Sequence, residues 1–335
     1  MPLNLLEIQP NKVSRDISSY TTLLFGPPKI GKSRLAAEFP APIFFCTEPT
    51  QETIPGAYLV PVRKWSEMKN YVKQLKQPAL KERFKTVVID VIDLAATYCE
   101  EYICGQQMVE AIKDIPWGEG YKMEENEFRK TLYDIRQEGY GLVMISHVTN
   151  TTFTREDGTE YDEKNPTIPG KRFKAIAENL ADIYGYIHMS KQEDGTYERV
   201  ISLRASDPST PNGNHFKYMP AEIPLSYEAL AKALKDAIDQ EEKELGSQFF
   251  VDKKEDSEPE ELDFEALLNE FNDMVAAVHK NVDKVDWKTV WTPKIVEITD
   301  RNLGKGKKVS DATPKQIEQI AVIVDELRSE IENGL

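Results

Sequence analysis

A glycine-rich segment between an apolar run and a helix-forming run constrains the fold of this chain more than any other feature. It follows Leu23-Leu24-Phe25 and consists of Gly26, Pro27, Pro28, Lys29, Ile30, Gly31, Lys32 and Ser33. Glycines let successive backbone N–H groups point at a phosphate, the lysine reaches the β- and γ-phosphates, and the serine hydroxyl holds Mg²⁺. The helix that opens near Lys32 adds its positive end to the same anion. The sequence therefore predicts a nucleotide-binding loop.

Apolar runs and helical patterns alternate around this loop, as in a layered α/β fold. Uninterrupted apolar strands are expected at 21–25, 42–46, 86–90 and 141–147. Burial on both faces indicates a mostly parallel sheet between helices. Further strands are expected at 57–60, 183–189, 197–204 and 215–219, and helices at 33–39, 65–77, 94–103, 121–138 and 226–239, with irregular chain at 105–120. The core is predicted to span 20–240, preceded by an arm at 1–19.

The net charge of −15 is concentrated after this core. Twelve acidic residues and three lysines between 241 and 270 account for nine of the net negative charges. Residues 241–262 are predicted to form an acidic, disordered linker, which is either a solvated spacer or a mimic of nucleic acid. Residues 263–335 are predicted to be a small helical domain, whose last helix begins at a Thr313–Gln316 capping box. It buries little area alone, so docking, oligomerisation or a partner is expected.

Composition excludes several classes of protein. The three cysteines, Cys46, Cys99 and Cys104, show neither paired spacing nor a nearby histidine pair, so no disulfide framework or zinc site is expected. No run of eighteen apolar residues is present, and the first ten residues do not resemble a signal peptide. These observations predict a protein of the cytoplasm without a membrane segment.

Polar residues at the ends of the buried strands supply candidate chemistry. Asp90 ends a buried strand and is expected to hold Mg²⁺ through water, while Asp93 either shares this role or caps the next helix. Glu48 follows the strand 42–46 and is the candidate to activate water. His147 ends the fourth strand, where a side chain can respond to the γ-phosphate and pass its state to the polar stretch 149–169. That stretch contains a hairpin turn signal at 156–158.

These residues together carry a family resemblance. The order is G-P-P-K-I-G-K-S, Glu48, V-V-I-D at 87–90, P-W-G-E-G-Y at 116–121, I-S-H at 145–147 and I-P-G-K-R-F-K at 168–174. It resembles the RecA-like ATP-binding proteins encoded by bacteriophages, including the Sak-type single-strand annealing ATPases, over about residues 15–240. The resemblance implies a RecA-like core that binds ATP and Mg²⁺ and self-associates into a ring or filament in the host cytoplasm.

The resemblance also implies roles for individual residues. Glu48 would be the catalytic base, and His147 would stand where the family usually has a glutamine that senses the γ-phosphate. Arg204 and Lys217 are the candidates to reach the neighbouring subunit's nucleotide. The loop after His147 would bind single-stranded DNA, for which the candidates are Arg155, Lys171, Arg172, Lys174 and Phe153, with Tyr161 and Phe173 as further aromatic residues.

Single strands bind to cations and aromatic faces, and this loop also holds five acidic residues, so the support from composition is mixed. Trp117 and Tyr121 are candidates for a second DNA-facing surface, and the alternative for Trp117 is internal packing.

The leading hypothesis is a Mg²⁺-dependent ATPase that acts on single-stranded DNA in phage recombination or replication. A helicase or helicase-loading motor is the first alternative, and a nucleotide-gated assembly protein with little turnover is the second. A phage replication or recombination protein is a possible partner for the C-terminal helices. A small-molecule kinase is disfavoured because no arginine-rich lid follows the phosphate loop.

Overall fold

The computed structural model describes residues 9–48, 53–154, 158–203, 214–253 and 262–334. The chain divides into two compact units, one spanning Pro10–Glu258 and the other containing Pro259–Leu335. No helix in the described ranges is both long enough and apolar enough to cross a membrane.

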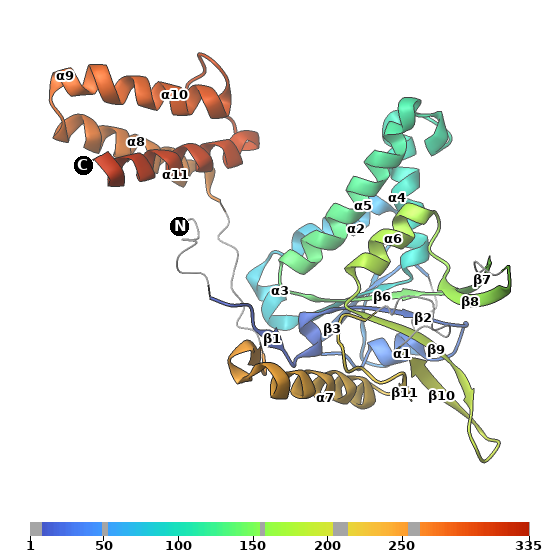
Figure 1. The fold of residues 1–335 in the computed structure, drawn as a ribbon. Coiled ribbons are helices and arrows are strands. Elements are labelled where there is room, and N and C mark those ends of the chain that lie inside the picture. The colour runs from blue at the N-terminus through green and yellow to red at the C-terminus, as the bar shows by residue number, and fades with distance from the viewer. Residues whose placement is uncertain (1–8, 49–52, 155–157, 204–213, 254–261, 335) are drawn as a thin grey trace. The chain divides into compact units, whose positions relative to one another are not determined.

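An eight-stranded sheet forms the centre of the first unit (Figure 1). Its order is β11-β10-β9-β2-β6-β5-β3-β4, and the strands from β9 to β4 are parallel. β10 and β11 continue the sheet in antiparallel fashion. The strands are β2 (Thr21–Phe25), β3 (Pro42–Cys46), β4 (Tyr58–Pro61), β5 (Thr86–Asp90), β6 (Gly141–Ser146), β9 (Ile183–Lys191), β10 (Tyr197–Ser202) and β11 (Glu222–Pro224). The predicted α/β fold with a mostly parallel sheet is confirmed.

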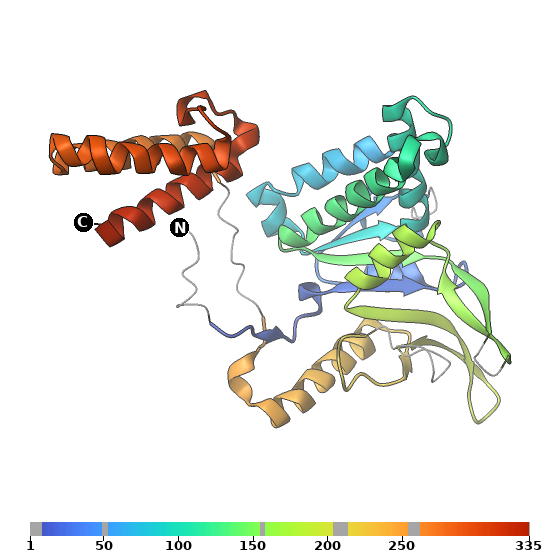
Figure 2. The ribbon, with the colours of Figure 1, turned by 45° about the horizontal axis from the view of Figure 1, so that its top comes forward.

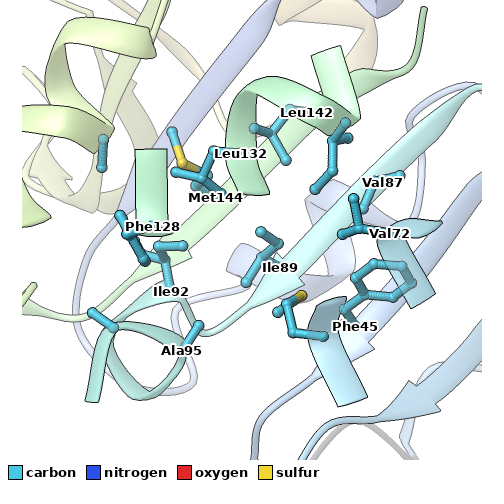
Figure 3. Close-up of a cluster of buried hydrophobic side chains, with 14 of the residues drawn as sticks. Phe45, Val72, Val87, Ile89, Ile92, Ala95, Phe128, Leu132, Leu142 and Met144 are labelled. Atoms are coloured by element: carbon cyan, nitrogen blue, oxygen red, sulfur yellow. The ribbon is translucent and has the colours of Figure 1, made fainter. Parts of the chain in front are cut away.

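Helices cover both faces of the sheet, because the strand side chains alternate between two apolar cores. One face packs against α2, α4, α5 and α6, and the other against α1 and α7 (Figure 1). Phe128 and Leu132 of α5 meet Ile89 and Met144 of the sheet in the first core (Figure 3). The helices are α1 (Lys32–Ala36), α2 (Trp65–Gln74), α3 (Pro78–Arg83), α4 (Ile92–Gln107), α5 (Glu119–Gln137), α6 (Lys171–Leu180) and α7 (Tyr227–Leu245).

Two extensions leave this layered core. An antiparallel hairpin, β7 (Val148–Thr154) with β8 (Glu160–Pro166), follows β6 directly and confirms the hairpin predicted from the turn signal. α4 and α5 lie side by side and extend beyond the sheet (Figure 2), and short 3₁₀ turns at Ile112–Asp114 and Pro116–Gly118 connect them. The segment predicted to be irregular is therefore largely helical.

The acidic segment after the core corrects an expectation. α7 continues to Leu245, and β12 (Phe250–Val251) pairs in parallel with β1 (Val13–Ser14) of the N-terminal arm. Arg15 pairs with Asp239 at 2.6 Å and with Glu242 at 2.5 Å, and Phe250 is buried, so neutralisation and apolar burial order this part. Disorder was therefore the wrong expectation for 241–253. Residues 254–261 lie outside the described part.

The strand expected at His215–Met219 is also corrected. These residues form a turn, and the edge strand is β11 a few residues later. Phe216 packs edge-on against Tyr20 at 4.9 Å, and the backbone N–H of His215 donates to the carbonyl of Asp182. The apolar residues of this segment therefore pack against the core from a turn, and the segment does not pair with a neighbouring strand.

The second unit is a small helical bundle with its own core. It contains α8 (Phe264–Asn281), α9 (Lys284–Asp286), a π-helical turn at Trp287–Trp291, α10 (Thr292–Leu303) and α11 (Ile317–Gly334). Ile320, Val324 and Leu327 are fully buried against residues such as Phe271 and Ile298. The Thr313–Gln316 capping box is present, as predicted.

A buried carboxyl group gives the first unit a pH-dependent stability. Glu124 on α5 is 5% exposed, and its Oε2 makes no hydrogen bond within the described residues. Burial, followed by the charge of Glu100 on α4, raises the pKa of Glu124 to about 7, while Arg172 on α6 opposes the shift. The folded state therefore holds this proton at pH values where the unfolded chain has lost it.

We expect Glu124→Gln to stabilise the protein more at pH 8 than at pH 5. At pH 8 the unfolded chain ionises Glu124 in water without cost, whereas the folded wild type must carry the charge in a buried place or keep the proton at a pH where solvent removes it. Both lower the stability of the wild type, and glutamine has neither cost. The advantage of glutamine in the free energy of unfolding should therefore grow by about 2 kcal/mol between these pH values. Urea unfolding at both pH values measures it, with Glu101→Gln at an exposed site of α4 as control. An advantage that does not change with pH would contradict the expectation.

Candidate nucleotide-binding site

The phosphate loop leaves the carboxyl end of β2 and opens into α1, as predicted. Gly31 has a φ of 118° and Lys29 a φ of 62°, so the chain turns through left-handed conformations within the loop. A Cβ at Gly26 would lie 2.4 Å from the carbonyl oxygen of Ile187 on β9. Glycine is therefore required at position 26 by the close approach of β9 and at position 31 by the backbone conformation.

Lys32 is held inside this loop. Its side chain is buried, and Nζ donates to the carbonyl oxygens of Gly26 at 2.8 Å and Pro27 at 2.9 Å. Burial lowers the pKa of Lys32, while the charges of Asp90, Asp93 and Glu48 raise it. The ammonium group is thus a preorganised positive charge that faces the acidic edge of the sheet.

Three neighbouring strands bring the candidate chemical groups to one edge. β3, β5 and β6 are adjacent and parallel, and Cys46 pairs with Asp90, which pairs with Ile145. Glu48, Asp90 and His147 therefore come together where these strands end, as predicted. Asp90 is 2% exposed.

Thr47 fastens the ends of β3 and β5 to each other. Its Oγ1 accepts from the N–H of Val91 at 2.7 Å and donates to the carbonyl of Val91 at 2.9 Å. Its own N–H donates to the carbonyl of Asp90. These bonds fix the residue before Glu48 at the end of β5.

Asp93 contacts the end of β6. This contact bears on one of the two roles considered for Asp93, the capping of the next helix. Val91 occupies the N-cap position of α4, and no side chain caps that helix end. The carboxylate of Asp93 instead accepts from Ser146 Oγ at 2.5 Å and from the backbone N–H of His147 at 2.9 Å. His147 Nδ1 lies 3.1 Å from the same carboxylate. Helix capping was therefore the wrong interpretation.

His147 lies between two carboxylates. Nδ1 faces Asp93, and Nε2 lies 4.0 Å from Glu48 Oε1. A carboxylate on Nδ1 favours the tautomer with the proton on that nitrogen and fixes the plane of the ring. The side chains of His147 and Glu48 are each about 30% exposed, so both remain open to a ligand. Asp93 therefore holds the imidazole of His147 in one orientation at the edge of the sheet.

The donor set at this edge fits Mg²⁺. Mg²⁺ keeps most of its waters and needs only one or two carboxylates besides the phosphates of a nucleotide. Ser33 in the loop and Asp90 at the edge would hold it there. The described ranges contain no cluster of three or more histidine, cysteine or acidic side chains that could hold a metal ion.

The residues predicted to reach a neighbouring subunit are not both placed. Arg204 lies outside the described residues. Lys217 pairs with Glu244 at 3.0 Å and lies 4.7 Å from the ring centre of Tyr218, so its charge is already used within the chain. A role for either residue in trans stays a prediction.

The candidate DNA-binding residues fall into distinct surroundings. Lys171 is exposed at the start of α6, and Arg172 stacks on Tyr121 at 4.6 Å, with Glu125 3.8 Å away. Lys174 donates to Asn165 at 2.7 Å and is partly buried. Arg155 and the side chains of Phe153 and Tyr161 lie outside the described part.

Two aromatic residues change their interpretation. Phe173 is 2% exposed and packs against Phe128 at 4.8 Å, so its assignment as a DNA-facing residue was wrong. Its place on α6 puts it in the apolar core. Trp117, by contrast, is 94% exposed at the turn between α4 and α5, which rules out internal packing.

The sequence pattern indicated neither Ser146 nor Thr47, and it did not indicate the contact of Asp93 with the end of β6. The partners of Asp93 lie more than fifty residues further along the chain, so no local pattern marks the contact. Ser146, in the middle of I-S-H, was the available signal. It is fully buried, and it accepts from the N–H of Thr167 at the end of the hairpin at 3.1 Å.

The fold and the site together define a P-loop NTPase. The sequence matches the model of a protein family described as AAA domain over residues 18–211, more than half of the chain, so the chain belongs to that family. It is also similar to the SPbeta prophage-derived uncharacterized protein YorG of Bacillus subtilis (strain 168). The two are 25% identical over 341 residues, which cover 98% of each chain.

The tight approach of β9 makes Gly26 a sensitive position. We expect Gly26→Ala to abolish the stabilisation that a nucleotide gives, because the new Cβ would displace the loop from Ile187. Thermal unfolding with and without Mg²⁺–ADP measures it. Gly105→Ala in α4 is the control, because a Cβ there meets nothing within 4 Å. A normal nucleotide-dependent shift in Gly26→Ala would contradict the geometry.

The contact between Asp93 and His147 predicts non-additive effects. If Asp93 acts through His147, Asp93→Ala and His147→Ala should each lower ATP turnover, and the double variant should lose little more than the stronger single variant. Steady-state phosphate release at saturating ATP measures this double-mutant cycle, with urea unfolding to confirm that each variant folds. Fully multiplicative losses would show that the two residues act independently.

Proposed function

We propose that this protein is a Mg²⁺-dependent ATPase that acts on single-stranded DNA in phage recombination or replication. Its AAA-domain family membership supports nucleotide chemistry, and its similarity over the full length to a prophage-derived protein supports a phage context. The order of motifs resembles the RecA-like phage ATPases, including the Sak-type annealing proteins, and supports the finer assignment.

The site supports hydrolysis by in-line attack of water on the γ-phosphate. Lys32 holds the phosphates, and Glu48 accepts the proton of the attacking water. Mg²⁺, when bound at Ser33 and Asp90, supplies charge neutralisation on the phosphate oxygens. The side chains of Glu48 and His147 are partly exposed, and the buried ammonium of Lys32 is held in the loop at the same edge of the sheet.

The single observation that carries the coupling to DNA is the bond network at the base of the β7–β8 hairpin. The N–H of Thr167 donates to the carbonyl of His147, and it also lies 3.1 Å from Ser146 Oγ. Ser146 and His147 are in turn held by Asp93. A change at His147 on γ-phosphate binding is thus transmitted to both ends of the hairpin, since β7 begins at Val148 and β8 ends at Pro166.

Residues at the start of α6, which follows this hairpin in the chain, and around the start of α5 support contact with a single strand. Exposed Lys171 and the Arg172–Tyr121 stack offer charge and a planar face, and Trp117 offers an exposed indole. Base stacking on aromatic side chains together with phosphate contacts is the usual mode for single strands. Self-association into a ring or filament would align these surfaces along one strand, and the C-terminal helical unit would bind a replication or recombination partner.

DNA-stimulated ATP hydrolysis tests this function. We expect single-stranded DNA to increase phosphate release by wild type, and Lys32→Ala to remove both basal and stimulated activity. Glu48→Gln should lower turnover about 100-fold or more while nucleotide still binds, because only the proton acceptor is lost. Glu82→Gln on the exposed surface of α3 is the matched control.

Each part of the function has an outcome that contradicts it. Unchanged turnover in Glu48→Gln would exclude Glu48 as the base. Turnover that no single-stranded or duplex DNA alters would exclude a DNA-dependent enzyme. Binding of ATP without turnover under any condition would favour a nucleotide-gated assembly protein, and directional unwinding of duplex DNA would favour a helicase.

A further inference from the structure

A cation on the antiparallel part of the sheet reaches the phosphate loop from the same chain. Phe25, the last residue of β2, pairs with Tyr186 of β9, and Tyr186 pairs with Ser202 of β10. Arg199 lies three residues before Ser202 and pairs with Met189. Because β10 runs antiparallel to β9, Arg199 stands beyond the carboxyl end of β2, at the level of the loop that follows it.

The side chain of Arg199 lies on the face of the sheet that carries α1. It is two residues from Ile201, which is fully buried in the core shared with α1 and α7. A Cβ placed on Gly31 would lie 3.6 Å from Arg199 Nη1 and 3.2 Å from Leu225 Cδ2. The N–H of Leu225 donates to the carbonyl of Arg199 at 3.0 Å, so both residues border the loop together.

The guanidinium of Arg199 is available for a ligand. The residue is exposed, and none of the hydrogen bonds or ion pairs of the described residues involves its side chain. Lys32, by contrast, is engaged by two loop carbonyls. An unpaired guanidinium beside a phosphate cradle is suited to bidentate contact with a phosphate.

The sheet order indicates which phosphate Arg199 contacts. Glu48, Asp90 and His147 follow β3, β5 and β6, which all lie on one side of β2, whereas β9 and β10 lie on the other. The γ-phosphate belongs beside the residue that activates water. A group that approaches the loop from β10 therefore meets the other end of the phosphate chain.

We infer that Arg199 binds the α-phosphate of the nucleotide in cis, with Leu225 as the apolar wall beside it. This inference rests on the proposed nucleotide site but requires neither hydrolysis nor DNA. Arg199 is a binding residue here, distinct from the residues expected to reach across a subunit interface. It holds diphosphate and triphosphate equally, so it retains the product as well as the substrate.

Calorimetric titration with Mg²⁺–ADP and with a non-hydrolysable ATP analogue tests the inference. We expect Arg199→Ala to weaken both ligands by a similar factor of about ten or more. Arg199→Lys should recover part of the affinity, because lysine keeps the positive charge but lacks the planar guanidinium that makes bidentate hydrogen bonds to a phosphate. Lys191→Ala is the matched control, because Lys191 lies on the same hairpin, paired with Tyr197 and further from the loop. Thermal unfolding without nucleotide checks that each variant folds.

The outcomes separate this inference from the proposed function. Unchanged affinity for both ligands in Arg199→Ala would overturn the inference and leave the nucleotide site intact. A loss confined to the ATP analogue would place Arg199 at the γ-phosphate and overturn the α-phosphate assignment. Failure of wild type to bind either ligand, with Lys32→Ala as reference, would overturn both proposals.

Discussion

The carboxylate of Asp93 is the group on which the reactive edge of this protein depends. It lies in the first turn of α4 and binds Ser146 Oγ, the backbone N–H of His147 and the imidazole of His147. Without it, Ser146 and His147 would lose the side-chain bonds that tie the end of β6 to the first turn of α4. One anion thus orients the histidine, anchors the start of the hairpin and adds negative charge opposite Lys32.

The parallel arrangement of the strands brings the functional residues to one edge of the sheet. Strands that run in one direction end at one edge, and each delivers one functional residue to it. Lys32 reaches the edge from β2, while Glu48, Asp90 and His147 arrive from β3, β5 and β6. The antiparallel strands beyond β9 approach the same loop from the opposite side, which is how Arg199 comes close to Gly31. The nucleotide would therefore lie between an acidic edge and the guanidinium of Arg199.

The sequence predicted the parts of this site that a local pattern encodes. The loop, the buried strands and the polar residue after each of them follow from spacing and composition. Contacts between distant segments could not be predicted in this way. No pattern near Asp93 indicates its contact with Ser146, and none near Gly31 indicates the approach of Arg199. Phe173 was misplaced because its motif was interpreted as loop, although Phe173, Ile176 and Ala177 have helical spacing and are buried. The acidic segment was wrongly predicted to be disordered because its composition shows many acidic residues. Composition does not show that Arg15, far away in the sequence, neutralises two acidic residues of α7, or that Phe250 is buried.

We propose that His147 responds to the presence of the γ-phosphate and that this response changes the β7–β8 hairpin. Hydrogen exchange of the backbone amides in Mg²⁺–ADP and in a non-hydrolysable ATP analogue tests it most directly. We predict that the Thr167 amide and its neighbours in β8 exchange at different rates in the two states, and that His147→Ala removes the difference. Identical exchange of these amides with ADP and with the ATP analogue in wild type would contradict the account.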